Sequence, residues 1–155
     1  MDYVIRALTT SDEPVLWEML YQALQTSEGA TSREIVRRPE FARYVEGWGR
    51  AGDTGFLAYD AKHDDELLGA VWLRSPRGEQ KQGEEPTPEL AFAVKPGLRK
   101  RGIGAALLTQ LVKTNPHHAI SMRASANNPA VRLYERFGFK VVEESPDAVT
   151  MRREI

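Results

Sequence analysis

One segment of the chain, GLRKRGIGAALL at residues 97–108, places three consecutive cations before a glycine pair and an apolar run. The segment follows a predicted strand over residues 89–94 and opens a predicted helix over about residues 102–113. Glycine lets the backbone approach another group closely, and the first N–H groups of a helix have no partner inside the helix. This order of elements therefore predicts an anion site, most simply a site for a phosphate.

Two nucleotide-binding motifs are similar to this segment, but each fails at specific positions. Gly97 and Gly102 have the spacing of a P-loop, yet Ile103 and Gly104 stand where that motif needs its lysine and its hydroxyl residue. Gly102 and Gly104 also match the start of a dinucleotide fingerprint, but Leu107 replaces its third glycine. The segment is therefore interpreted as an anion site of a different kind.

The rest of the sequence predicts a single domain over residues 1–155, of the α/β (α+β) class, with one mixed sheet. The second helix is expected over about residues 32–48, and Pro39 is expected to divide it, because proline lacks the N–H that a helix needs. The polar stretch 75–88 is expected to be a long loop. The expected order is β-α-α-β-β-β-α-β-α-β-β, with strands at 3–8, 55–61, 66–74, 89–94, 119–124, 139–144 and 148–155, and helices starting at 11–14, 32, 102 and 128.

Composition excludes several classes of protein. The formal net charge is −1, which argues against a general affinity for nucleic acid, and no cysteine is present for a disulfide or a thiol nucleophile. No apolar run approaches the ~20 residues that a membrane helix needs, so a cytoplasmic location without membrane contact is the expectation. The three histidines are His63, His117 and His118. None has a carboxylate at metal-ligand spacing, so we expect no metal.

A second motif lies downstream and gives the segment a family context. Residues 99–104 have the form R/Q-x-x-G-x-G/A, and residues 127–139, NNPAVRLYERFGF, have the form N-x-x-A-x-x-L-Y-x-x-x-G-F. The two motifs, in this order, resemble the signatures of the GCN5-related N-acetyltransferase (GNAT) superfamily. The resemblance implies a splayed sheet and an acyltransferase that moves the acetyl group of acetyl-CoA to a primary amine of a small molecule or peptide in a ternary complex. A non-catalytic acyl-CoA-binding module of the same fold is the alternative.

The resemblance also implies which residues bind the cofactor. The backbone around residues 92–94 would pair with the pantetheine arm and polarise the acetyl carbonyl, while residues 99–105 would cradle the pyrophosphate. One of the three cations in that loop could instead be only solvated, and Asn127 would hydrogen-bond cofactor amides. The expected cofactor-binding residues are Phe92, Ala93, Val94, Arg99, Lys100, Arg101, Gly102, Ile103, Gly104, Ala105, Asn127 and Tyr134.

Two residues are candidates for proton transfer. By resemblance, Tyr134 would protonate the leaving thiolate, and a buried aromatic with no chemical role is the alternative. Glu89 opens the central strand where some members carry a basic carboxylate, and an exposed strand-start glutamate is the alternative. For the acceptor site the sequence gives only candidate residues: Trp17, Tyr21, Tyr44, Glu46, Trp48 and Trp72. A homodimer is common in such folds.

Overall fold

The computed structural model describes residues 3–27, 32–50, 53–63, 66–74, 87–95, 102–114, 119–125 and 130–154. Within these residues the chain forms a seven-stranded mixed sheet with strand order β1-β2-β3-β4-β5-β7-β6, flanked by helices. The expected class and element order are confirmed. The strands are β1 (Val4–Ala7), β2 (Thr54–Asp60), β3 (Glu66–Arg74), β4 (Glu89–Val94), β5 (Ala119–Ser125), β6 (Lys140–Glu144) and β7 (Ala148–Glu154). The helices are α1 (Glu13–Ser27), α2 (Pro39–Ala42), α3 (Ile103–Thr114) and α4 (Ala130–Arg136), with 3₁₀ turns η1 (Thr10–Asp12) and η2 (Arg33–Arg37).

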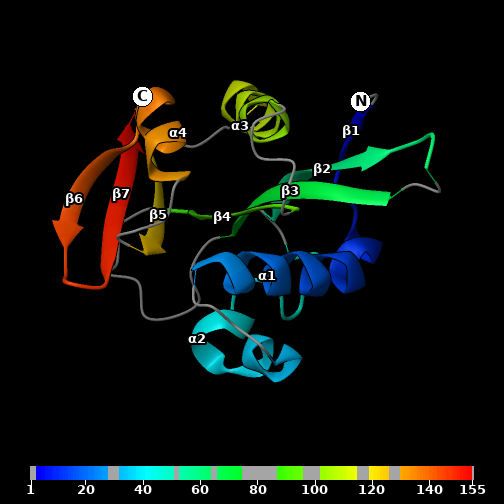
Figure 1. Ribbon diagram of the computed structural model, residues 1–155, viewed down its shortest axis with the longest axis horizontal. Helices are drawn as coiled ribbons and strands as arrows, with labels where there is room; N and C mark the ends of the chain where they lie inside the picture. The colour runs from blue at the N-terminus through cyan, green and yellow to red at the C-terminus, as the bar shows by residue number, and fades with distance from the viewer. Residues whose placement is uncertain are drawn as a thin grey trace.

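The helices lie on both faces of the sheet, with α1 and α2 on one side and α3 and α4 on the other (Figure 1). Alternation along β3 supplies both layers of core. Val71 and Leu73 are buried with the apolar side of α3, whereas Ala70 and Trp72 are buried with α1. All four side chains are inaccessible to solvent, and burying a large apolar side chain stabilises a fold by about 1.5–3 kcal/mol.

The start of α1 differs from the sequence-based expectation, which began the helix at residues 11–14. The chain enters through the 3₁₀ turn η1, and Thr9 is the N-cap residue with extended backbone angles. The Asp12 carboxylate accepts hydrogen bonds from the Thr9 backbone N–H at 2.6 Å and from the Thr9 hydroxyl at 3.1 Å. Because Asp12 fits this role three residues after Thr9, the helical turn begins earlier than the apolar repeat indicates.

The helix expected to begin at residue 32 and run to residue 48 is replaced by two short helical pieces. The five-residue turn η2 ends at Arg38, whose backbone is extended, and α2 begins with Pro39 and contains four residues. The residue before a proline is driven out of the helical region, so the break falls where proline predicts it. The remainder, residues 43–47, is a set of turns, and the expectation of a continuing helix there was wrong.

The ion pair between Arg6 and Asp12 fixes this entry into α1. Arg6 donates to both Asp12 oxygens, at 2.8 and 2.9 Å, and these hydrogen bonds hold the pKa of Asp12 at about 2 despite its burial. The folded-state pKa lies below the ordinary value near 3.9, so the ionised carboxylate stabilises the fold above about pH 4. That stabilisation is lost as the pH falls through 2.

Replacing the carboxylate tests this linkage. We expect Asp12→Asn to lower the free energy of unfolding by about 1 kcal/mol at pH 7, because Arg6 is partly exposed and the pair is screened. The difference from wild type should shrink as the pH falls from 5 to 3. Urea unfolding at steps of one pH unit measures it, and a difference that stays constant over this range would contradict the assignment.

Candidate functional site

The sheet is split between β4 and β5. In the described part of the chain these parallel strands pair at one position, Glu89 with Ser121, next to a hydrogen bond of 3.0 Å from Ser121 N–H to Pro88 C=O. On its other edge β4 pairs with β3 along its whole length. The backbone groups of residues 90–94 that point away from β3 therefore have no described strand to bond, and they are available to an extended ligand.

The backbone of residues 92–94, expected to contact the cofactor, lies on this open edge. Phe92 and Val94 are partly exposed, and Ala93 is buried against the α1 side. Core packing was expected for the side chains of Phe92 and Val94. Phe92 does pack against the core on the α3 side, in which Leu90 is buried, whereas Val94 is partly exposed. This part of β4 thus has side chains that pack against the core and main-chain groups that can hydrogen-bond an extended ligand.

The N-terminus of α3 lies at the glycine-rich segment. Gly102 has a φ of +79°, and no described atom lies within 4 Å of the position that a Cβ would take there. The first helical bond runs from Ala106 N–H to Gly102 C=O at 3.0 Å, so the N–H groups of residues 103–105 have no acceptor within the helix. Arg99, Lys100, Arg101 and Asn127, also expected at the cofactor, lie outside the described residues.

Gly104 allows close packing within the protein. A Cβ on this residue would lie 2.8 Å from Phe92 Cζ and 3.3 Å from Leu133 Cδ2. A side chain at position 104 would therefore meet the protein itself before it met a phosphate. Gly104 lets α3 pack closely on β4 and α4, while Gly102 is the glycine that faces open space.

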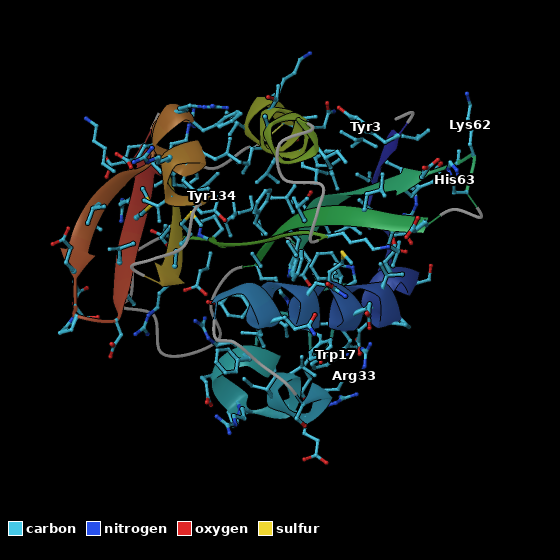
Figure 2. All side chains as sticks on the ribbon, in the orientation of Figure 1. Tyr3, Trp17, Arg33, Lys62, His63 and Tyr134 are labelled. Atoms are coloured by element: carbon cyan, nitrogen blue, oxygen red, sulfur yellow. The ribbon has the colours of Figure 1, made fainter. Side chains whose placement is uncertain are left out.

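Tyr134 lies in the split, on α4. Its side chain is 3% exposed, and its ring makes edge-to-face contacts with Phe92 at 5.6 Å and Phe139 at 6.1 Å between centroids. Figure 2 shows Tyr134 near the point where β4 and β5 diverge. Tyr134 is therefore both a core residue, because its ring packs with Phe92, and a site residue, because it lines a cavity.

Glu89 lies in a cluster with two residues of the α2 region. Its Oε2 atom is 2.7 Å from Nη1 of Arg43, yet this buried oxygen accepts no well-aligned hydrogen bond from a described residue. Nη2 of Arg43 donates to the Tyr44 hydroxyl at 2.9 Å, and the guanidinium stacks on the Tyr44 ring. Burial and then the Glu89 carboxylate raise the pKa of Tyr44 above its ordinary value, so this hydroxyl keeps its proton at neutral pH.

The turns after α2 are held against β3 by Arg74, a residue that sequence reasoning missed. Its side chain is 4% exposed, and it pairs with the equally buried Asp53 at 3.2 Å. The guanidinium also donates to three main-chain carbonyls, those of Arg43 at 3.2 Å, Glu46 at 2.7 Å and Gly47 at 3.3 Å. Trp72 adds a bond of 2.9 Å from its indole N–H to the Tyr44 carbonyl. We call these contacts the Arg74 clamp.

A cavity of about 380 Å³ joins these parts, and it runs from α1 and α2 to Tyr134 in the split. Of the six acceptor candidates, Tyr44 is the one that lines it. Trp48 and Trp72 are buried in the core. The guanidinium groups of Arg37 and Arg33 lie over the rings of Trp17 and Tyr21, respectively. The lining consists of Leu20, Ala23, Leu24, Glu40, Phe41, Arg43, Tyr44, Leu90, Ala91, Phe92, Met122, Arg123, Ala124, Tyr134, Asp147 and Ala148.

The described residues contain no group of three histidine, cysteine or acidic side chains that could hold a metal ion. His63 instead pairs with Asp60 at 2.8 Å in the turn between β2 and β3, and the other two histidines lie outside the described residues. No helix in the described part of the chain is long and apolar enough to cross a membrane.

Comparisons with known proteins agree with this architecture. A sequence profile of the acetyltransferase (GNAT) family matches residues 17–139. Mycothiol acetyltransferase of Acidimicrobium ferrooxidans is 34% identical over 109 residues, which is 66% of this chain and 33% of that protein, so the chain spans about a third of its relative's length.

Two solved structures share the fold over nearly the whole chain. The PaiA N-acetyltransferase of Thermoplasma acidophilum in complex with coenzyme A has a TM-score of 0.68 at 19% identity and covers 100% of both chains. NAA60 of Arabidopsis thaliana in complex with acetyl-CoA has a TM-score of 0.66 at 23% identity and covers 99% of both chains.

Removing the Arg74 guanidinium measures how much the Arg74 clamp contributes to the free energy of unfolding. We expect Arg74→Met to lower the free energy of unfolding by about 3–5 kcal/mol. The variant removes the cation 3.2 Å from the buried Asp53 carboxylate, leaving Arg50 at 3.9 Å, and it also removes the donor to three main-chain carbonyls. Arg152→Met is the matched control, since Arg152 pairs with Glu154 on the surface and its loss should cost no more than about 1 kcal/mol. Urea unfolding of both variants measures this, and equal losses would refute the structural role of Arg74.

Proposed function

This chain belongs to the acetyltransferase (GNAT) family, and from that premise we propose that it transfers the acetyl group of acetyl-CoA to a primary amine of a small molecule or peptide within a ternary complex. The observation that carries the proposal is the split between β4 and β5, which leaves a main-chain edge unpaired beside Tyr134. The two solved structures in complex with coenzyme A and acetyl-CoA support this donor.

The residues of the split fit a long anionic cofactor. We assign the pyrophosphate to the open side of Gly102 and to the N–H groups of Ile103, Gly104 and Ala105, where the helix dipole favours negative charge. Arg99, Lys100 and Arg101 would add attraction, and Asn127 would bond cofactor amides. The free edge of β4 at Phe92, Ala93 and Val94 would pair with the pantetheine arm, and an N–H donor there would polarise the acetyl carbonyl.

The chain's own groups then have three tasks: to position the amine, accept its proton and protonate the leaving sulfur. The thioester supplies an activated acetyl group, and the N–C bond forms as the C–S bond breaks. Tyr134 donates its phenolic proton toward the sulfur, and Glu89 is the candidate acceptor for the amine proton, because its Oε2 retains hydrogen-bonding capacity. Positioning alone can contribute up to about 7–11 kcal/mol in ideal cases.

The proton-donor role of Tyr134 can be separated from its packing role. Tyr134→Phe keeps the ring contacts with Phe92 and Phe139 and removes only the hydroxyl. We expect kcat for acetyl transfer to fall by about 10²-fold or more while the affinity for acetyl-CoA changes little. Coenzyme A release with a thiol reagent measures the rate, and Tyr59→Phe on β2 is the control. Unchanged kcat in Tyr134→Phe would leave this tyrosine as a packing residue.

The phosphate assignment can be tested with a charge placed at the open glycine. Aspartate and asparagine both tolerate positive φ better than most residues and have the same shape, so the two variants differ in charge alone. We expect Gly102→Asp to weaken acetyl-CoA binding at least about tenfold relative to Gly102→Asn. Calorimetric titration of folded protein, checked by circular dichroism, gives both affinities. Equal affinities would show that the phosphates lie elsewhere.

A further inference from the structure

Four charged side chains line the cavity, and they differ in how they are partnered. Arg43 is fully engaged, since it pairs with Glu89, donates to the Tyr44 hydroxyl and donates through Nε to the Glu40 main-chain carbonyl at 3.2 Å. Its charge is therefore used within the protein, and it serves to build the cavity wall. The other three, Glu40, Arg123 and Asp147, belong to α2, β5 and the turn before β7.

These three side chains have no ion-pair partner among the residues that the structure describes, and each is exposed at the rim of the cavity. Arg123 acts on the interior nonetheless. Its positive charge opposes the upward shift that burial gives the pKa of Tyr44, which places the guanidinium within electrostatic reach of that hydroxyl. With respect to the residues that the structure describes, the rim thus presents one cation and two anions without an ion-pair partner.

The walls between these charges are apolar. Leu20 and Leu24 come from α1, Phe41 from α2, and Leu90 and Met122 from the two diverging strands. The cavity volume of about 380 Å³ is at the small end of the range for ligand pockets. The thioester end of the cofactor would take the part beside Phe92 and Tyr134, so the remainder suits a compact molecule with a few polar groups. The cavity therefore combines an apolar interior with charges of both signs at its opening.

We propose that the acetyl acceptor is a zwitterion of amino-acid size, with a free amine and a carboxylate. Arg123 binds the carboxylate, since guanidinium and carboxylate match as paired donors and acceptors. Glu40 and Asp147 favour the approach of the ammonium form, and the apolar walls hold the side chain. This inference rests on the proposed function, because it names the substrate class of that site.

The test compares acceptors that differ only in the carboxylate. One set is L-leucine, L-leucinamide and 3-methylbutylamine, a second is glycine, glycinamide and methylamine, and leucylglycine distinguishes a peptide source from a free amino acid. We expect wild type to acetylate at least one acid with a kcat/KM at least about tenfold above that of its amide. Binding of N-acetyl-L-leucine and N-acetyl-L-leucinamide to the coenzyme A complex, by calorimetry, should show the same preference.

Two variants test whether Arg123 causes the preference for acids over amides. Arg123→Gln should bring the acid-to-amide ratio close to one in turnover and in binding. Arg132→Gln is the matched control, because Arg132 is exposed on α4 and lies outside the cavity lining, and it should keep the wild-type ratio.

Three results would overturn the inference: acids no better than amides in both assays, a preference that persists in Arg123→Gln, or an equal loss of preference in Arg132→Gln. Titration of acetyl-CoA into the same wild-type preparation separates the two levels of the argument. Tight acetyl-CoA binding without an acid preference refutes the zwitterionic acceptor alone, whereas absent binding refutes the proposed function as well.

Discussion

The interruption of the sheet after Glu89 is the constraint on which the rest of the structure depends. One ladder contact joins β4 to β5, and beyond it the two halves of the sheet must be held by other means. Side chains on the α3 face do this. Tyr134 of α4 contacts Phe92 of β4 and Phe139, and they pack in one core with Ile120 and Met122 of β5 and Met151 of β7. An aromatic cluster thus covers the split from this face of the sheet, while the edge of β4 beyond Glu89 has no described strand partner on the β5 side.

The Glu89 end of the split is also its most polar point. Glu89, the first residue of β4, pairs on both edges of the strand, with Arg74 on β3 and Ser121 on β5. Its side chain meets Arg43, and the main chain of Arg43 is held by Arg74. Two guanidinium groups and two carboxylates therefore connect the fixed end of the split to the wall beside α2, so the geometry of the cavity depends on the integrity of the sheet.

The sequence predicted the parts of this arrangement that rest on local periodicity. The apolar run of β3, the alternation in β4 and the apolar repeat of α3 specify their own secondary structure, and Gly102 marks the turn before α3. The sequence did not predict the ion pairs of Arg43 with Glu89 or Arg74 with Asp53, because each joins segments that only the folded sheet brings together. The length of the helix from residue 32 was overestimated for the opposite reason. Its apolar spacing continues past Pro39, but the helical backbone is interrupted at this proline.

The Arg74 clamp has a consequence for how such a site can diversify. Arg74 and Trp72 hold the turns after α2 through main-chain carbonyls, which every amino acid carries, so the attachment is indifferent to most side chains of the residues that it holds. Positions 43, 44 and 46 can therefore exchange their side chains while the turn keeps its place, whereas Gly47 is restricted by its φ of +72°. Under the proposed function, substitutions at positions 43 and 44, which line the cavity, would change the substrate range without changing the fold around it.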